Sequence, residues 1–413
     1  MAAELTEATQ DAAIARTAIP ASTKSLRQEF AQTAAEVDRT GSDPAANLRR
    51  IHDAGLTRLL LPAAYGGVAS AQALAADLPL ITDVLTEISA GESATAQIWS
   101  IHLVAARLIF GGALTVDESV RAEIAHGLLN DGMRLANSAA EGGPRRGEYH
   151  VTADPVEGGF RLSGVKLFNT GTAGATYTIT PVRIRGSEDK GVVYLLVRMD
   201  AEGVKPHNDW DNMGQRATGS GTITFENVFV PARYCFPMAA GADGLTGPSS
   251  VIGPFFQLLI SATILGMGFG ALDAMAAFVR DHARPNLPTL DRAADDPVNR
   301  LHIGRASAAL AAAHTLQRDA SQMVVDAETG AADRGTCAVQ MMRSKTVTVE
   351  TVLDVTSQVH GLAGGRATGN KYRLDRFWRN ARTLSVHDPI DAMAQQIGAF
   401  EIHGAPPVPS VGT

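Results

Sequence analysis

The sequence contains few of the residues that cross-link a fold, bind clustered metals or attract polyanions. Cysteine occurs twice in 413 residues, at Cys235 and Cys337, which is too few for a disulfide framework or a multi-cysteine metal site and fits a reducing compartment. Lys and Arg total 36 against 43 Asp and Glu, a formal net charge of -7, so a broad cationic surface for nucleic acid is not expected. Only 5% of the chain is aromatic whereas 45% is hydrophobic, which predicts a large aliphatic core.

Neither a secretory signal nor a membrane span is expected. The first 16 residues carry three carboxylates, Glu4, Glu7 and Asp11, where a signal peptide has positive charge followed by an apolar run. Residues 251–270 form a long stretch without a formal charge, but Pro254 and Gln257 interrupt its apolarity, as in a buried bundle helix. We therefore expect a cytoplasmic protein.

The spacing of apolar residues divides the chain into three regions. Helical spacing holds from about residue 23 to 128, short strand-like segments follow from about 133 to 231, and long Ala-rich helical stretches begin at about 250. We predict an N-terminal α-helical domain at residues 1–130, a middle antiparallel β-domain at 131–245 and a C-terminal helical bundle at 246–413. The fold class is α+β, mostly α.

Common catalytic signatures are missing from the sequence. It has no phosphate-binding P-loop, no HExxH zinc pair and no nucleophile elbow. Gly266, Gly268 and Ala271 match the G-x-G-x-x-A dinucleotide fingerprint, but they lie in a helical run without a preceding strand. We interpret these small residues as a site of close helix packing, and no metal site is predicted.

Two histidines stand out, because histidine is the side chain best suited to exchange protons near neutral pH. His102 lies on a predicted helix after residues 97–101 (QIWSI), and His387 lies in residues 385–389 (SVHDP) near the end of the chain. Each by itself is more typical of a hydrogen-bonded core or surface histidine than of a catalyst. Their sequence context decides between these interpretations.

That context resembles the acyl-CoA dehydrogenase superfamily over nearly the whole chain. The segments that carry the resemblance occur in the family's order at residues 55–56, 61–62 and 65–67, then 164–171 (GVKLFNTG), 213–221 (MGQRATGSG) and 228–231 (VFVP). The resemblance implies an N-terminal helical domain, a β-barrel-like middle domain and a C-terminal four-helix bundle. It also implies a flavin held between them and a homotetramer.

The C-terminal region favours one branch of that superfamily. Where many acyl-CoA dehydrogenases carry a catalytic glutamate, this chain has His387-Asp388-Pro389, and Asp388 is a shorter carboxylate placed before a proline that restricts its backbone. Residues 283–285, 293–297, 303–304 and 374–389 instead resemble the flavin-dependent monooxygenases. The similarity is to dibenzothiophene monooxygenase and to the sulfur-acquisition enzymes that act on methanesulfinate or dimethyl sulfone.

This resemblance implies the site residues. His387 would assist proton transfer, His102 would orient oxygen or substrate, and Thr170 would hydrogen-bond near the flavin. The family also implies that His387 and His102 flank the flavin and that Arg284 meets its phosphate, with Arg366 and Ala367 nearby. The other implied flavin contacts are Asn137, Ser138, Ala139, Ala140, Glu141, Lys166, Leu167, Phe168 and Asn169. An arginine fork suits a phosphate, and hydroxyls suit the polar edge of the ring. Trp99, Phe168 and Trp378 are the aromatic residues expected near the pocket.

The implied activity is that of a two-component monooxygenase. Reduced FMN would come from a separate NAD(P)H-dependent reductase, since the sequence has no credible nicotinamide-binding unit. A flavin C4a-peroxide would oxygenate a small substrate, which the resemblance implies is an organosulfur compound, in a dry cavity. Three alternatives remain open. They are an acyl-CoA dehydrogenase with bound FAD, a flavin-dependent N-hydroxylase of amines or amino sugars, and a non-enzymatic binding scaffold.

Overall fold

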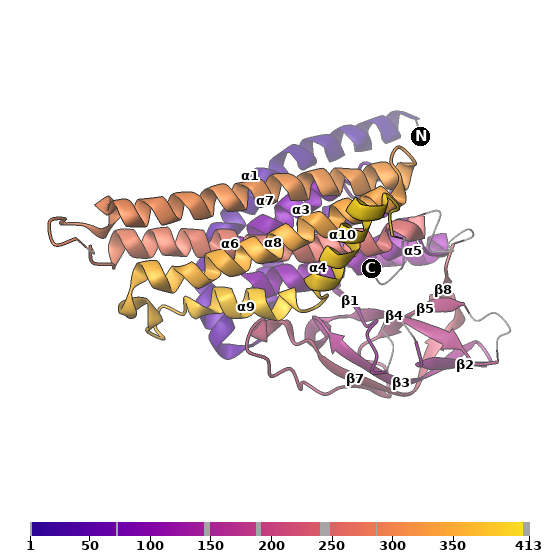
Figure 1. Ribbon diagram of the computed structural model, residues 1–413. Helices are drawn as coiled ribbons and strands as arrows, with labels where there is room; N and C mark the ends of the chain where they lie inside the picture. The colour runs from indigo at the N-terminus through magenta and orange to yellow at the C-terminus, as the bar shows by residue number, and fades with distance from the viewer. Residues whose placement is uncertain are drawn as a thin grey trace.

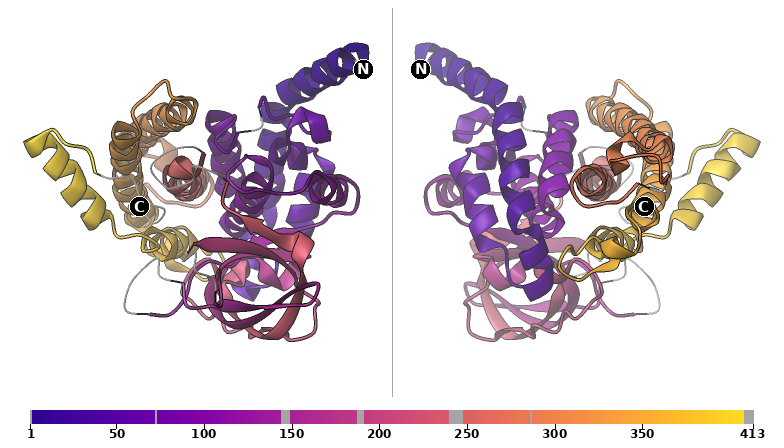
Figure 2. Two further views of the ribbon diagram at one scale, coloured as in Figure 1. Left: turned by 90° about the vertical axis from the view of Figure 1, so that its right-hand side faces the viewer. Right: turned by 90° about the vertical axis from the view of Figure 1, so that its left-hand side faces the viewer.

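The computed structural model describes residues 2–71, 73–143, 149–186, 191–239, 248–285 and 287–407, and it has a helical, then a β, then a second helical region (Figure 1). The first region contains α1 (Ala2–Thr40), α2 (Ala45–Asp53), α3 (Leu78–Gly91), α4 (Ser93–Phe110) and α5 (Glu118–Asn130). The last contains α6 (Ile252–Asp281), α7 (Pro297–Thr329), α8 (Arg334–Ala363), α9 (Asp375–Ser385) and α10 (Ile390–His403). Figure 2 shows the two helical regions side by side, with the sheet beneath both.

The sheet is mixed, although the pattern of short segments predicted an antiparallel one. Its strands are β1 (Leu135–Asn137), β2 (Thr152–Val156), β3 (Gly159–Asn169), β4 (Tyr177–Ile184), β5 (Val192–Arg198), β6 (Val204–Pro206), β7 (Gly221–Pro231) and β8 (Cys235–Pro237). They lie in the order β6-β7-β3-β2-β4-β5-β8, with β1 against β4. β4 runs parallel to both β1 and β2, and the other pairs are antiparallel. The α+β, mostly helical class is confirmed, and only the direction of these pairs is corrected.

Strand β3 ends in a distorted segment that positions part of the site. Its register against β7 shifts between Lys166 and Asn169, and Phe168 within that shift has a positive φ of 55°. A left-handed conformation is uncommon for a bulky residue and is kept only where the surroundings impose it. The bulge therefore turns Phe168 out of the strand, and its side chain is 67% exposed.

Helix α6 is the apolar stretch that raised the question of a membrane span. It is long and apolar enough to cross a membrane, but 83% of its most apolar window is buried inside the protein. A Cβ on Gly266 would lie 2.3 Å from the backbone oxygen of Thr86 in α3, and one on Gly270 would lie 2.5 Å from that of Ala90. These glycines let α3 and α6 pack at close range, so the packing interpretation of this glycine-rich run is confirmed and α6 is a core helix.

One of the hydrophobic clusters spans all three regions, while two others lie within the C-terminal bundle and within the β-domain. A single buried cluster joins α3 and α4 to strand residues such as Ile179 and Leu196, and also to Ala320 and Met341 of the C-terminal bundle. Because these side chains bury each other's apolar surface, each region depends on the others for part of its stability.

Candidate active site

A buried hydrogen-bond network joins the end of β3, helix α4, the loop before β7 and helix α9. Gln97 on α4 donates to the Thr170 hydroxyl at 3.2 Å, and the Gln215 side chain donates to the Gln97 amide oxygen at 2.7 Å. Asn380 on α9 accepts the backbone N–H of Gln215 at 2.7 Å and donates to the Ser93 hydroxyl at 3.0 Å. We call this set, together with Thr218 and Ser220, the Thr170 network. It fixes Thr170 relative to all three regions of the chain.

Aromatic surface and unpartnered polar atoms also occur on α4, β1 and β3. The exposed Phe168 ring packs edge-on against Trp210, with ring centroids 6.4 Å apart. Among the described residues, the side-chain oxygens of Asn137 and Asn169 and the indole nitrogen of Trp99 are buried without a hydrogen-bond partner. Buried polar atoms normally find partners, so such atoms indicate a ligand or an ordered water. An exposed ring, a hydroxyl and unpartnered amide oxygens fit the flat face and polar edge of a flavin.

His102 is buried on α4, five residues after Gln97. Its Nδ1 accepts the backbone N–H of Leu135, at the start of β1, at 2.9 Å. Burial, together with the nearby charge of Arg134, lowers the pKa of His102 to about 4. The ring is therefore neutral near pH 7, and because Nδ1 accepts, the proton is on Nε2. His102 is thus a fixed hydrogen-bond donor.

His387 lies just after α9, about 10 Å along the chain from Asn380 at a helical rise. Its Nδ1 is 2.6 Å from Oδ2 of Asp388, and its side chain is 40% exposed. Asp388 is buried and also accepts a hydrogen bond from Gln257 of α6 at 2.8 Å, while Lys345 of α8 lies at 3.3 Å. Phe256 packs edge-on against the imidazole. The imidazole of His387 is therefore held through Nδ1 by a buried carboxylate, which fixes its orientation.

The charge of Asp388 is fixed by this environment. Burial alone would raise the pKa of Asp388, but the hydrogen bond from His387 and the charges of His387 and Lys345 hold it well below its usual range. Lys345 is fully buried and also donates to Gln257. Asp388 is consequently a permanent carboxylate that orients His387 and is a weak base itself.

Several residues implied by the resemblance have other roles here. Lys166 is fully buried and forms an ion pair with the buried Glu141, whose other oxygen accepts the backbone N–H groups of His150 and Val151. Burial lowers the pKa of Lys166 to about 8. Since both charges are used inside the β-domain, these side chains hold the sheet and do not present charge to a ligand.

The neighbouring chain from Ser138 to Ala140 is likewise engaged with the sheet. The Ser138 hydroxyl pairs with Thr178 at 2.7 Å, and its backbone N–H and oxygen bond to Ile179 and Thr180. The oxygen of Ala139 accepts from Lys166, and that of Ala140 accepts from the backbone N–H of Leu167 at 2.8 Å. The Ser138 side chain thus helps to hold β1 against β4.

The residues predicted to bind the flavin phosphate lie at the end of α6 that is opposite to His387. Arg366 donates to the backbone oxygen of His282 at 2.8 Å, two residues before the exposed Arg284, and Ala367 is buried beside them. His387 instead contacts Phe256 near the start of α6, and α6 extends about 38 Å from Phe256 to Asp281. Within one chain, these arginines cannot contact a flavin mononucleotide that also reaches His387. Trp378, which was expected near the flavin pocket, lines a surface pocket together with His360 and Asp375.

Sequence reasoning missed the residues that hold the candidate catalytic groups in place. Gln215, Thr218 and Ser220 lie in residues 213–221, which served only to identify the family. Lys345 is the only lysine of α8 and is fully buried, but its sequence neighbours Arg343, Ser344 and Thr346 are polar and give no signal of that burial. The tertiary fold, not local spacing, brings it to Asp388.

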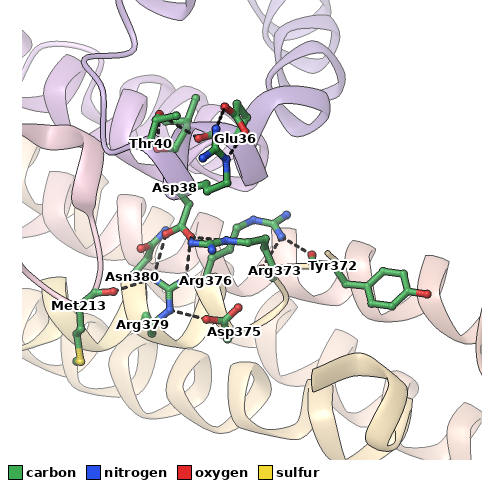
Figure 3. A network of polar contacts seen from close by, with 12 residues as sticks. Glu36, Asp38, Thr40, Met213, Tyr372, Arg373, Asp375, Arg376, Arg379 and Asn380 are labelled. Atoms are coloured by element: carbon green, nitrogen blue, oxygen red, sulfur yellow. Dashed lines mark hydrogen bonds and ion pairs between the residues drawn. The ribbon is translucent and has the colours of Figure 1, made fainter. Parts of the chain in front are cut away.

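A second polar cluster anchors α9 to α1 (Figure 3). Asp38 of α1 is almost completely buried and binds Arg379 at 2.7 Å and also Arg373. Arg379 also donates to the backbone oxygen of Met213 at 2.7 Å, in the loop that contains Gln215. Burial lowers the pKa of the adjacent Arg376 to about 10. This cluster holds α9, and with it the Thr170 network, against the N-terminal region.

Comparison with known proteins identifies two domains of one family. Residues 140–228 match the acyl-CoA dehydrogenase middle domain, and residues 258–392 match the acyl-CoA dehydrogenase C-terminal domain. Dibenzothiophene monooxygenase of Rhodococcus qingshengii is 29% identical, over 94% of this chain and 93% of that protein. The probable FMNH2-dependent monooxygenase SfnC of Pseudomonas putida is 27% identical, over 94% of this chain and 95% of its own length.

A solved structure extends the similarity to three dimensions. The crystal structure of FMN-bound TdsC from Paenibacillus sp. A11-2 is 25% identical, with a TM-score of 0.84 over 96% of this chain and 100% of that one.

Proposed function

Because the chain belongs to the acyl-CoA dehydrogenase superfamily, on its branch of flavin-dependent monooxygenases, we propose that it uses reduced FMN and O2 to oxygenate a small organosulfur compound. Bound reduced FMN supplies the electrons that activate oxygen for transfer. The preference for sulfur rests on the relatives, whose names give dibenzothiophene as the substrate of one of them. A separate flavin reductase would supply the reduced FMN, consistent with the FMNH2-dependent relative.

The observation that carries this proposal is the state of Asp388. An acyl-CoA dehydrogenase needs a carboxylate that is free to remove a proton from its substrate, and Asp388 is the carboxylate at the corresponding position. Here it is 3% exposed and is bound to His387, Gln257 and Lys345. Helix α6 has no acidic residue before Asp273 to replace it. The site therefore offers an oriented histidine in place of a carboxylate base.

The chain's own groups would then divide the work in the following way. His387, oriented through Nδ1 by Asp388, holds or delivers a proton. His102, neutral and donating from Nε2, orients oxygen or substrate. Phe168 covers the flavin ring, and Thr170 and Asn137 bind its polar edge. The helices packed over the sheet exclude water, which limits wasteful release of hydrogen peroxide.

We also propose that a second copy of the chain completes the phosphate site. Arg284 and Arg366 suit a phosphate chemically, yet within one chain they lie at the opposite end of α6 from His387. A homotetramer, as the resemblance implies, would bring these arginines to the flavin of a neighbouring subunit. The two-component enzyme would then bind FMN only when assembled.

A direct assay tests the proposed function. The protein is combined with a flavin reductase, NADH and FMN, and offered methanesulfinate, dimethyl sulfone or dibenzothiophene, with product mass as the readout. We expect an oxygenated product from at least one sulfur compound, and none when the reductase is left out. His387→Ala should lose product and release more hydrogen peroxide, whereas His126→Ala, at an exposed position on α5, should match the wild type.

Three further measurements on the same protein distinguish the competing functions. Bleaching of a bound oxidised flavin by an acyl-CoA without reductase would indicate a dehydrogenase. Oxygenation of amines alone would indicate an N-hydroxylase. Failure to bind either FMN or FAD would indicate a binding scaffold. Unchanged oxygenation and peroxide release in His387→Ala would refute the role of that histidine.

A further inference from the structure

The hydroxyl of Thr170 is the first in a row of three hydroxyls that are linked by hydrogen bonds. Thr170 Oγ1 lies 2.8 Å from the Ser220 hydroxyl, and Ser220 Oγ lies 2.7 Å from the Thr218 hydroxyl. Thr218 can in turn donate to the backbone oxygen of Gln215 at 2.8 Å. All three side chains are buried, so these are the partners that the hydroxyls have. Each hydroxyl carries one hydrogen, and the direction of one bond therefore sets the direction of the next.

One side of Thr170 is fixed by Gln97. The Gln215 amide nitrogen donates to Gln97 Oε1 at 2.7 Å and to the Ser93 backbone oxygen at 3.1 Å, while its oxygen accepts from the Ser93 hydroxyl at 2.7 Å. These contacts leave Gln97 only its amide N–H groups to direct toward Thr170. Thr170 therefore always accepts from Gln97, and it keeps one lone pair and its own hydrogen for other partners.

Two arrangements of the three hydroxyls satisfy every bond. In the first, Thr170 donates to Ser220, Ser220 donates to Thr218, and Thr218 donates to the oxygen of Gln215. In the second, Thr218 donates to Ser220 and Ser220 donates to Thr170, so that the Thr170 hydrogen is free to point outward. The oxygen of Gln215 keeps partners in both arrangements, because the Trp210 indole donates to it at 2.9 Å and the backbone N–H of Thr218 also does.

We propose that Ser220 and Thr218 are positioning residues that let Thr170 switch between accepting a hydrogen bond from reduced FMN and donating one to oxidised FMN. This inference rests on the proposed function, and in particular on Thr170 binding the polar edge of the flavin. The redox-active ring nitrogen of a flavin carries a hydrogen when reduced and a lone pair when oxidised. The first arrangement suits the reduced ring and the second suits the oxidised ring. The change is a rotation of three O–H bonds, and no proton is gained or lost.

Removing the Ser220 hydroxyl should affect the two redox states unequally. In Ser220→Ala, Thr170 loses the acceptor that it needs while it receives a bond from the reduced flavin, but it can still donate to the oxidised flavin. Because the Thr170 hydroxyl is then unsatisfied in the complex with reduced FMN, we expect the Kd for reduced FMN to rise by about fivefold. The Kd for oxidised FMN should change by less than about twofold. Thr218→Val should act in the same direction, because Ser220 then lacks its acceptor.

The test is a pair of anaerobic calorimetric titrations of the full-length protein, one with FMN and one with photoreduced FMN. The controls are Thr218→Ser, which keeps the hydroxyl, and Ser100→Ala, which removes a buried hydroxyl that bonds to the Gln97 backbone outside this chain of hydroxyls. Both should keep the wild-type ratio of the two Kd values. If Ser220→Ala does not fold, the near-isosteric Thr218→Val gives the same comparison.

The outcomes separate this inference from the proposed function. A raised ratio of reduced to oxidised Kd in Ser220→Ala and Thr218→Val, but not in the controls, supports the switch. Equal losses in both redox states, an unchanged ratio, or the same change in Thr218→Ser would overturn it. If the wild-type protein binds FMN in neither redox state, it is the proposed function that fails.

Discussion

At the scale of single residues, the site depends on charges that are held in one state. Asp388 is kept ionised by His387 and by the fully buried Lys345, and His102 is kept neutral by burial. Buried charged groups are costly unless they are paired, so each of these states needs the partners that the fold supplies. The two histidines consequently have different properties, since one is a fixed donor and the other is oriented by a carboxylate.

Replacing Asp388 tests the orientation of His387. In Asp388→Asn, the buried anion that fixes the imidazole is lost and Lys345 is left without its counter-charge. We expect the rate of product formation to fall on the order of a hundredfold, with the Kd for reduced FMN changed little. The matched control is Asp391→Asn, which alters an exposed carboxylate in the first turn of α10. A variant that oxygenates substrate at the wild-type rate would show that His387 needs no oriented tautomer.

His102 predicts a specific dependence of stability on pH. Its pKa falls from an ordinary 6.5 to about 4 in the folded protein, so the unfolded chain binds a proton first as the pH drops. The contribution of neutral His102 to the free energy of unfolding is complete above pH 6.5 and is lost as the pH falls toward 4. The free energy of unfolding should therefore fall by about 2 kcal/mol between about pH 7 and about pH 5. Urea unfolding should show this loss in the wild type. His102→Asn keeps an acceptor for the backbone N–H of Leu135 and should not show this loss. If the free energy of unfolding depends on pH equally in the wild type and in His102→Asn, His102 is not the group responsible.

The sequence located the segments that form the site better than it predicted what each side chain in them does. The segments around Thr170, His102 and His387 were recognisable, and the structure brings Thr170 and Asn380 into one network. The roles of Lys166, Glu141 and Ser138 were not recognisable, because a strand residue that faces the interior of the sheet and one that faces a ligand differ only in the side to which they point. The bulge at Phe168 sets that side, and it depends on pairing with β7.

At the scale of secondary-structure elements, α9 carries much of the organisation of the site. Asn380 on one side of it holds the Thr170 network, Arg379 holds α1 and the loop at Met213, and His387 follows its last turn. A Cβ on Gly214 would lie 2.1 Å from the backbone oxygen of Arg379, so the loop sits directly on the helix. Displacing α9 would therefore change the site without altering any catalytic side chain.

Asp38 tests this anchoring role. Asp38→Asn leaves Arg373 and Arg379 without their buried counter-charge, and we expect it to lower the free energy of unfolding by about 2–4 kcal/mol. Glu36→Gln on the same helix is the control, because its pair with Arg39 is exposed and should contribute nothing measurable. Chemical denaturation of both variants checks the difference. Equal stability of the two variants would show that the cluster does not anchor α9.

At the scale of the whole molecule, the fold class followed from apolar spacing and the family from ordered motifs. The parallel pairs of β4 could not be predicted in this way, because strand direction depends on how distant segments meet. The domain limits at residues 130 and 245 and the cytoplasmic location stay predictions. The separation of Arg284 from His387 could not be read from the sequence either, since it follows from the length and direction of α6.

That separation makes the shared site testable by mixing subunits. Arg284→Ala and His387→Ala proteins should each be nearly inactive with reductase, FMN and substrate. When the two are unfolded together and refolded as mixed assemblies, some sites combine an intact His387 with an intact Arg284 from a neighbour. We expect a substantial part of the activity to return, measured as product formed per subunit. Mixtures that stay as inactive as the separate variants would show that each chain builds its site alone.

The central claim is that the chain transfers an oxygen atom from O2 to its substrate using reduced FMN. The most direct measurement is the mass of the product formed under ¹⁸O2 in the presence of a flavin reductase, NADH, FMN and a sulfur substrate. The proposed function predicts a product that carries one ¹⁸O atom, formed only when the reductase is present. A product without ¹⁸O, or flavin reduction by an acyl-CoA in the absence of reductase, would contradict it.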